Sequence, residues 1–335
     1  MIKEATEKIQ RGINLTKDQM RCVMEEIMQG KTQTQEIVDF LIALNKKGET
    51  PDEVEAAVVV MRSHATSIKT KGKVVLDTCG TGGDRLGTFN ISTCVAFVAS
   101  ACGITVAKHG NRSVSSACGS ADILEALGIN INLSVERIER CLEEVGIAFL
   151  FAPNLHPAMK YAMPARKKIQ TKTIFNILGP LTNPADATHQ LIGVYDDRLR
   201  KIVADVLKNL GTQHALVVHA DDGLDEITLT TSTKITEVNK DKIMDYEIIP
   251  EDFGFKRVTL EELKGGSVSD NVKILQEVLS GKKGPKRDIV VLNAAAAIYA
   301  ADKVASIKEG IALASQAIDK GLALKKLTLL KEYSL

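Results

Sequence analysis

The residues with the clearest chemical potential are four glycines, at positions 80, 82, 83 and 87, which follow the apolar run 74–76. Asn90, Ser92 and Thr93 come next, where an alanine-rich apolar segment typical of a helix begins. Glycines let backbone N–H groups approach an anion, and a helix start adds the positive end of its dipole. This stretch predicts a strand, a phosphate-binding loop and a helix. On this stretch alone, a glycine-rich turn that binds no ligand is an equally good interpretation.

The loop has neither of the two common glycine motifs. A P-loop requires a Lys after its last glycine, and none follows here. The dinucleotide fingerprint Gly-x-Gly-x-x-Gly fails because Arg85 takes the place of the final glycine. Other stretches must therefore decide whether an anion binds.

A second polar loop, residues 108–120, follows the apolar run 104–107. It contains the cations Lys108 and Arg112, several serines, and Gly110 and Gly119. Charges, hydroxyl groups and free amides suit an anionic ligand, although a polar surface loop is the alternative. Two such loops at the ends of neighbouring strands favour a ligand rich in phosphate.

An acidic turn, residues 220–226, follows the run 214–219 and carries Asp221, Asp222, Asp225 and Glu226. Carboxylates this close repel one another unless water or a cation neutralises them, and hard divalent ions prefer oxygen ligands. Magnesium held by one or two carboxylates and substrate phosphates fits better than an all-protein calcium site. A solvated acidic turn is the alternative. His214 and His219 lie at the two ends of the run, and we assign them no metal role.

The elements that must position these loops follow a simple pattern. Residues 1–70 are predicted to be helical, with capping boxes at Thr16 and Thr50. From residue 73 onward, short apolar runs alternate with helical segments, which is typical of a mostly parallel sheet. In such sheets ligands collect outside the carboxyl ends of the strands. The predicted strands are residues 74–77, 104–107, 147–151, 189–195, 214–219 and 288–292.

Composition excludes several classes of function. The 335 residues include 43 Lys and Arg against 42 Asp and Glu, so no overall charge favours nucleic acid or anionic lipid. We expect no secretory signal, because the first residues are charged, and no membrane span, because the run 294–301 is too short. Six scattered cysteines without a C-x-x-C pair predict a cytoplasmic protein. Cys79 could be a nucleophile, but a small loop residue is the preferred interpretation.

Taken together, these residues resemble the anthranilate phosphoribosyltransferases, enzymes of tryptophan biosynthesis. The resemblance spans nearly the whole chain, and the combination of motifs is highly specific. The matching motifs are residues 77–84 (DTCGTGGD), 90–93 (NIST), 108–116 (KHGNRSVSS), 119–128 (GSADILEALG), 151–160 (FAPNLHPAMK), 173–184 (TIFNILGPLTNP) and 223–226 (GLDE).

The resemblance implies a magnesium-dependent glycosyltransferase that joins anthranilate to phosphoribosyl pyrophosphate. The positions matched to magnesium ligands, for two ions, are Ser92, Asp225 and Glu226. Those matched to anthranilate are Gly80, Asn111 and Arg166. Those matched to phosphoribosyl pyrophosphate are Gly80, Gly83, Asp84, Thr88, Asn90, Ile91, Ser92, Thr93, Lys108, His109, Gly110, Asn111, Arg112, Ser113, Val114, Ser115, Ser116 and Ser120.

The implied fold is a small N-terminal helical domain plus a larger α/β domain with a mostly parallel sheet, like the nucleoside phosphorylases and related phosphoribosyltransferases. We expect residues 1–70, joined by a segment near 163–185, to form the first domain and residues 71–335 the second. A homodimer through the helical domain is expected. The chain departs from the family pattern at Ala165, Gln170 and Lys172, where the family has Pro-Val-Arg and Gly-x-Arg-Thr, which leaves open how the aromatic ring fits.

Two other functions remain open on the sequence. A pyrimidine nucleoside phosphorylase shares the architecture and also acts at a ribose C1, but its phosphate loops differ. A non-catalytic relative that binds nucleic acid is disfavoured by the balanced charge and by the acidic pair Asp225 and Glu226.

Overall fold

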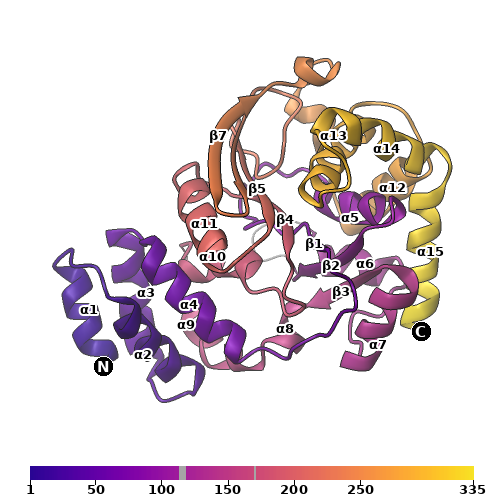
Figure 1. Ribbon diagram of the computed structural model, residues 1–335. Helices are drawn as coiled ribbons and strands as arrows, with labels where there is room; N and C mark the ends of the chain where they lie inside the picture. The colour runs from indigo at the N-terminus through magenta and orange to yellow at the C-terminus, as the bar shows by residue number, and fades with distance from the viewer. Residues whose placement is uncertain (113–117, 170) are drawn as a thin grey trace.

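Four helices precede the first strand in the computed structural model, which describes residues 1–112, 118–169 and 171–335. Thr16 and Thr50 form the predicted capping boxes, with Gln19 and Glu53 as their partners. The four helices pack as two pairs, α1 on α3 and α2 on α4 (Figure 1). Their bounds are α1 (Ile2–Gln10), α2 (Lys17–Met28), α3 (Thr34–Lys47) and α4 (Pro51–Ser63).

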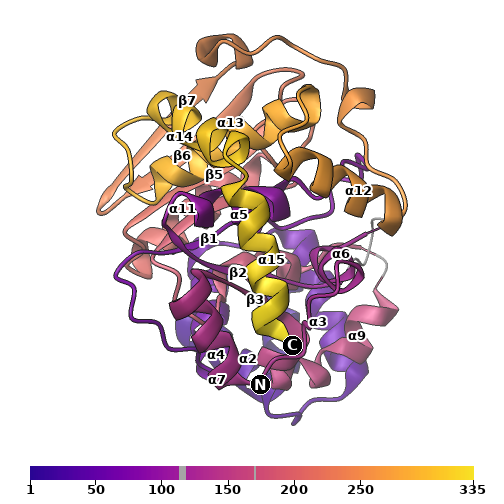
Figure 2. The ribbon, with the colours of Figure 1, turned by 90° about the vertical axis from the view of Figure 1, so that its right-hand side faces the viewer.

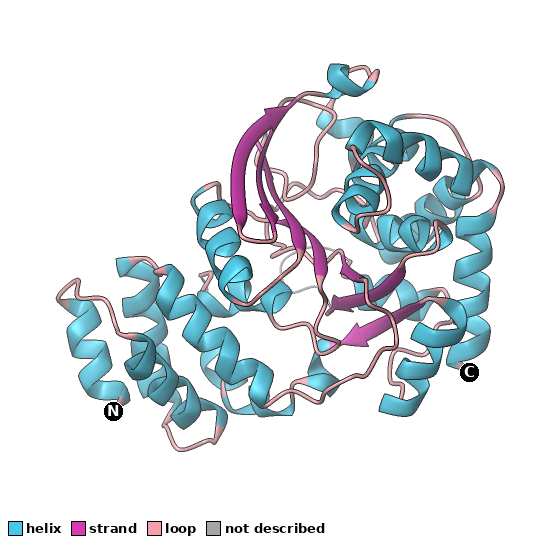
Figure 3. Ribbon diagram, in the orientation of Figure 1, coloured by secondary structure: helices cyan, strands magenta, loops and turns pink. Residues whose placement is uncertain are grey.

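A seven-stranded sheet forms the centre of the larger part, in the order β3-β2-β1-β4-β5-β6-β7. The first five strands of this order are parallel, and β6 and β7 join them as an antiparallel hairpin. The sheet is strongly twisted, as Figure 3 shows. The strands are β1 (Val75–Asp77), β2 (Thr105–Gly110), β3 (Ile147–Phe151), β4 (His189–Gly193), β5 (His214–Ala220), β6 (Thr233–Asn239) and β7 (Lys242–Ile248).

Helices cover both faces of this sheet. Helices α5 and α13 pack together against one face, with α14 and α15 outside them, while α11 packs on β5 and β6 and also contacts α4 (Figures 1 and 2). Their bounds are α5 (Ile91–Ala101), α11 (Arg198–Asn209), α12 (Val268–Leu279), α13 (Pro285–Ala300), α14 (Ile307–Asp319) and α15 (Leu322–Ser334).

Shorter helices connect the strands. Helices α9 and α10 follow β3 and pack against α3 and α4, so the middle of the chain returns to the N-terminal helices. The short elements are α6 (Ser120–Ala126), α7 (Val135–Arg140), the π-helix η1 (Cys141–Val145), α8 (Ala152–Leu155), α9 (Met163–Lys168) and α10 (Ile174–Leu181), with the 3-10 helices η2 (Pro157–Tyr161), η3 (Pro250–Phe253) and η4 (Leu260–Leu263).

Five of the six predicted strands are confirmed, and the sixth is wrong. Residues 288–292 lie inside α13, which begins at Pro285 and is buried along almost its whole length. A helix buried on all sides has no polar stripe, so its short apolar run cannot be distinguished from a buried strand by periodicity. The hairpin of β6 and β7 was not predicted, and β7 is an edge strand with a largely exposed face.

Two hydrophobic cores hold the fold together. One lies among β1, β2, β3, α5 and α13, and the other joins the N-terminal helices to α10, α11 and the opposite face of β4 and β5. Among the residues described, no helix combines the length and apolar character needed to cross a membrane. The carboxyl ends of β1, β2, β4 and β5 share one edge, where the predicted loops begin.

Candidate active site

The glycine loop, residues 80–87, leaves β1 and turns beside the end of β4. The Thr81 N–H donates a hydrogen bond to the Gly193 carbonyl oxygen at 2.8 Å. A Cβ atom at Gly80 would lie 3.0 Å from that oxygen, so a side chain would be crowded there. The other glycines of the loop adopt positive φ angles, which favour glycine: Gly82 (63°), Gly83 (84°) and Gly87 (72°).

The glycine loop is joined to the acidic turn. A Cβ atom at Gly80 would lie 3.4 Å from Asp225 Oδ2, so the loop and this carboxylate are in contact. The Gly82 backbone favours the ionised form of Asp225, and the Ser92 backbone favours that of Glu226. Asp84 also faces Asp225. We call Asp84, Asp225 and Glu226 the acidic cluster. These contacts place the loops after β1 and β5 together at one edge of the sheet.

The acidic cluster holds more negative charge than its surroundings offset. Burial, followed by repulsion from Asp84, raises the pKa of Asp225, and burial followed by the charge of Asp225 raises the pKa of Glu226. Ionised carboxylates packed this closely require a cation. Lys108 is a positive group near them, and its charge acts to lower the pKa of Glu226.

The donor atoms of the cluster fit magnesium. All are oxygens, the ligands that this ion prefers. Asp84 Oδ2 is buried and accepts no hydrogen bond from the residues described. The acidic cluster and the Ser92 hydroxyl therefore provide oxygen ligands in one place. The negative charge there is not balanced by neighbouring cations.

Lys108, in β2, holds the residues next to this cluster by hydrogen bonds. Its side chain is buried, and Nζ donates to Thr78 O at 3.2 Å, to Thr78 Oγ1 at 3.3 Å and to Ser92 Oγ at 3.3 Å. An ammonium group has three protons, and all three have acceptors here. Lys108 therefore fixes the position of Ser92 and the end of β1.

The remaining predicted residues after β1 surround the start of α5. Thr88 forms an isolated bridge with Lys264, and Asn90 precedes the helix, where its Nδ2 donates to Cys118 O at 3.1 Å. Ile91 and Thr93 are buried in the first turn. Asn90 Oδ1 and Thr93 Oγ1 have no hydrogen-bond partner among the residues described.

The second predicted loop is only partly described. Arg112 is exposed and pairs with Asp122 at 3.0 Å and with Glu125 at 2.9 Å, both on α6. The Ser120 hydroxyl donates to the Asn111 carbonyl at 3.3 Å. Arg112 thus faces α6 in this state rather than the acidic cluster. The predicted residues Ser113, Val114, Ser115 and Ser116, and the departure at Gln170, lie outside the described residues.

Arg166 lies on α9, apart from the glycine loop. Its guanidinium stacks 5.4 Å from the centre of the Phe175 ring, and burial lowers its pKa. Within the described residues no carboxylate pairs with it. Helix α10 continues from Phe175 to Gly179, whose carbonyl lies 3.1 Å from His109 Nδ1 at the end of β2. Arg166 is thus connected through α10 to His109 at the end of β2.

His109 has a neighbour that the sequence did not reveal. The ring centres of His109 and His156 are 5.1 Å apart, and Nε2 of each is buried without a partner among the residues described. Burial, and then the neighbouring imidazole, lowers the pKa of His109 to about 3, and burial lowers the pKa of His156 to about 4. Both rings are therefore neutral near pH 7.

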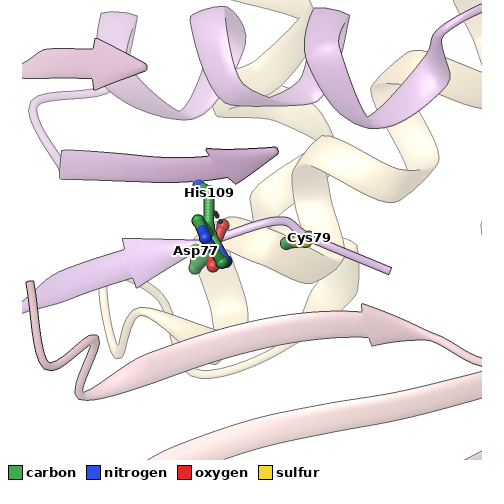
Figure 4. A group of neighbouring side chains, drawn as sticks. All are labelled: Asp77, Cys79 and His109. Atoms are coloured by element: carbon green, nitrogen blue, oxygen red, sulfur yellow. Dashed lines mark hydrogen bonds between the residues drawn. The ribbon is translucent and has the colours of Figure 1, made fainter. Parts of the chain in front are cut away.

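Asp77, Cys79 and His109 lie close together near the ends of β1 and β2 (Figure 4). Asp77 accepts hydrogen bonds from the His109 N–H at 3.1 Å and from Asn183 Nδ2 at 2.7 Å, so both of its oxygens have partners. Burial raises the pKa of the Cys79 thiol, which keeps it protonated. The group therefore supports the loop structurally and suits neither a metal nor a thiolate nucleophile.

The amino ends of β4 and β5 carry a different group of charges, which we call the histidine cluster: His189, His214, Glu237 and Asp302. His214 contacts Asp302 at 2.7 Å and Glu237 at 3.1 Å, and His189 contacts Asp302 at 3.2 Å. Burial alone would lower the pKa of His214, but its bonds to Glu237 and Asp302 outweigh burial and raise it. Each histidine is thus paired with protein carboxylates.

Two residues that shape the site were missed. Gly193 ends β4, and a Cβ atom there would overlap the backbone of Asp225. Asn183 holds both Asp77 and the Ala107 carbonyl, at 2.7 and 2.8 Å. Gly193 lay inside the predicted strand 189–195, where a glycine was a usable signal of close backbone approach, whereas Asn183 had been interpreted only as part of a turn.

Comparison with known proteins defines the class first. Residues 3–65 match the helical bundle domain of a glycosyl transferase family, and residues 72–324 match the a/b domain of the same family. A curated relative from Petrotoga mobilis, an anthranilate phosphoribosyltransferase, is 50% identical over 98% of this chain and 95% of its own length. The chain therefore belongs to the anthranilate phosphoribosyltransferase family.

Solved structures agree with this assignment. The anthranilate phosphoribosyltransferase of Thermus thermophilus is 40% identical, with a TM-score of 0.93 over 98% of this chain and 99% of that one. The Saccharomyces cerevisiae enzyme, solved with PRPP and Mg, is 25% identical, with a TM-score of 0.92 over 99% and 97%. The same yeast enzyme has also been solved with 4-fluoroanthranilate, at 25% identity and a TM-score of 0.89 over 99% and 97%.

Proposed function

We propose that the glycine loop, the acidic cluster and Arg166 form the substrate site of this enzyme. The chain transfers the phosphoribosyl group of 5-phosphoribosyl 1-pyrophosphate to the amine of anthranilate, a step of tryptophan biosynthesis that releases pyrophosphate. The observation that carries the proposal is that Asp225 lies against the glycine loop and Glu226 lies beside Ser92, at one edge of the sheet.

The phosphoribosyl pyrophosphate site is assigned to the glycine loop, the start of α5 and the loop after β2. Glycine-loop amides and the N-terminus of α5 donate to phosphate oxygens. Asp225, Glu226 and Ser92 would hold two magnesium ions, with Asp84 beside them. When bound, magnesium supplies positive charge that stabilises the departing pyrophosphate.

The chain's own residues perform the remaining tasks. Lys108 keeps Ser92 in place through a hydrogen bond to its hydroxyl, and Asn183 keeps the end of β1 in place through Asp77. The aromatic amine attacks as a neutral group, so the reaction does not require a strong base. The neutral His109 and the protonated Cys79 agree with that requirement.

Anthranilate is assigned to Gly80, Asn111 and Arg166. A half-buried guanidinium without a carboxylate partner among the described residues can form a charge-assisted, bidentate pair with the substrate carboxylate. Such a pair would direct the amine of anthranilate toward the ribose.

The proposal extends to assembly and location. We infer a helical domain of residues 1–70 joined by the segment near 163–185, a catalytic domain of residues 71–335, and a homodimer through the helical domain. Ile13, Ile42 and Val59 are exposed apolar residues on the N-terminal helices and their loops, which supports an interface there. We place the enzyme in the cytoplasm. Analytical ultracentrifugation tests the dimer, and a monomer at micromolar concentration would refute it.

The direct test of the function mixes the protein with phosphoribosyl pyrophosphate, magnesium and anthranilate. Anthranilate fluorescence is expected to disappear, and chelation of the metal is expected to stop the loss. Thymidine and phosphate, tested in parallel, should give no phosphorolysis. Persistent anthranilate fluorescence with all components present would contradict the proposal.

A further inference from the structure

Lys172 is a cation beside the glycine loop that none of the roles above uses. It lies between α9 and α10, and its side chain is half-buried. A Cβ atom at Gly83 would be 3.1 Å from Lys172 Cε and 3.4 Å from Nζ. The ammonium group therefore approaches the loop as closely as the missing side chain of Gly83 allows.

The ammonium group of Lys172 has no anionic partner. Its Nζ lies 3.3 Å from the centre of the Tyr195 ring, a cation–π contact. Across the described residues it makes neither an ion pair nor a hydrogen bond. A ring face holds a cation without neutralising it, so the charge stays available to an anion in the cleft.

The acidic cluster acts on this charge. Burial, and then the positive charge of Arg85, lowers the pKa of Lys172, while Asp225, Asp84 and Asp196 act in the opposite direction. Lys172 therefore lies within electrostatic reach of the carboxylates assigned to magnesium. An anion bound with the metal would meet Lys172 on its other side.

Both parts of the protein fix the position of Lys172. Its carbonyl oxygen accepts a hydrogen bond from Asn45 Nδ2 of α3 at 2.8 Å. Tyr195, on which its ammonium rests, donates its N–H to Thr81 Oγ1 of the glycine loop at 3.1 Å. The backbone of Lys172 is thus held by an N-terminal helix, and its side chain rests on a residue bonded to the glycine loop.

We propose that Lys172 is a further substrate-binding residue, whose ammonium binds the diphosphate of phosphoribosyl pyrophosphate across the glycine loop from Asp225. This inference rests on the proposed function. It assigns to one lysine a share of the diphosphate charge that the glycine-loop amides and magnesium leave unneutralised.

The test compares Lys172→Met and Lys172→Arg with Lys168→Met, an exposed lysine on α9 that serves as the matched control. Calorimetric titration with pyrophosphate and magnesium measures binding without turnover. We expect Lys172→Met to raise Kd for pyrophosphate and KM for phosphoribosyl pyrophosphate about tenfold, the loss of one charge-assisted hydrogen bond. KM for anthranilate should change less than about twofold.

Lys172→Arg should recover most of the affinity, and Lys168→Met should behave as the unmodified protein. All variants should unfold at the unmodified temperature. Unchanged pyrophosphate binding by Lys172→Met would overturn the inference, as would an arginine variant that folds normally yet binds as weakly as the methionine variant. Failure of the proposed function is a separate result, because it would show as no anthranilate turnover by the unmodified protein.

Discussion

Buried carboxylates lie at both ends of the central strands, but the protein neutralises them at only one of the two ends. At the carboxyl ends, the acidic cluster includes Asp225 and Glu226, whose pKa values burial and mutual repulsion raise. At the amino ends, the histidine cluster contains Glu237 and Asp302, whose pKa values burial would raise but hydrogen bonds, above all those to His214, lower.

The difference lies in where the compensating charge comes from. The histidine cluster is neutralised by the protein itself, and Tyr246 and Tyr299 donate further hydrogen bonds to Glu237 at 2.7 and 2.9 Å. The acidic cluster has too few cations of its own. Carboxylates that the protein itself neutralises indicate a structural role. Carboxylates left without enough positive charge indicate a site for a bound cation.

The strongest way to break the comparison is to neutralise the acidic pair. We expect Asp225→Asn with Glu226→Gln to lower kcat/KM about a thousandfold, because the metal loses its ligands, while the unfolding temperature stays equal or rises as repulsion is relieved. Fluorescence assays over a magnesium series and thermal unfolding measure the two effects. Asp221→Asn, in the same turn but paired with Lys234, is the control. An unchanged metal dependence would remove the acidic pair from the mechanism.

The mirror experiment removes the centre of the histidine cluster. His214→Ala should destabilise the protein by about 3 kcal/mol, because the buried Glu237 loses its only paired imidazole and keeps only the two tyrosine hydroxyls. The turnover of the folded protein should remain near normal. Denaturant unfolding measures the loss, and His64→Ala, which breaks a more exposed pair with Glu25, should cost less than about 0.5 kcal/mol. A large fall in kcat at full folding would show that the two clusters are not separate.

A third substitution tests Arg166, the cation proposed to bind anthranilate. Arg166→Met should raise KM for anthranilate about thirtyfold, the value of a charge-assisted pair, and leave KM for phosphoribosyl pyrophosphate nearly unchanged. Initial rates with each substrate varied in turn give both constants. Equal losses for the two substrates would contradict the assignment of Arg166 to anthranilate.

The smallest effect is the pH dependence of the histidine cluster. The raised pKa of His214 means that its contribution to stability is complete below its unfolded value of 6.5 and is lost as the pH rises through the folded value. The destabilisation caused by His214→Ala should therefore be larger at about pH 5.5 than at about pH 8.5. Denaturant unfolding of both proteins at each pH measures this difference. A gap that widens with rising pH would show that His214 is neutral in the folded protein.

Much of the fold and part of the site could be predicted because their signals are local. Apolar runs that end in glycines marked the ends of β1 and β2, and Asp225 and Glu226 followed β5 at the same edge. The rule that parallel strands share a carboxyl edge then brought these loops together. The capping boxes at Thr16 and Thr50 were predictable for the same reason, since both partners lie three residues apart.

The rest depends on contacts between distant positions. Asn183 reaches Asp77 across 106 positions of sequence, and the approach of Gly193 to Asp225 depends on how two loops pack. Burial on all sides removed the helical pattern of residues 288–292. The pairing of His214 with Asp302 was invisible because only the folded chain brings the end of α13 to the first residue of β5.

Gly193 carries no functional group, yet it sets a limit on how the enzyme can be redesigned. Because its backbone meets the backbone of Asp225, no choice of rotamer could make room for a methyl group at this position. Any side chain at residue 193 would shift the acidic turn, which carries the proposed magnesium ligands Asp225 and Glu226, away from the glycine loop. Attempts to alter metal preference should therefore keep glycine at position 193 and vary the carboxylate residues instead.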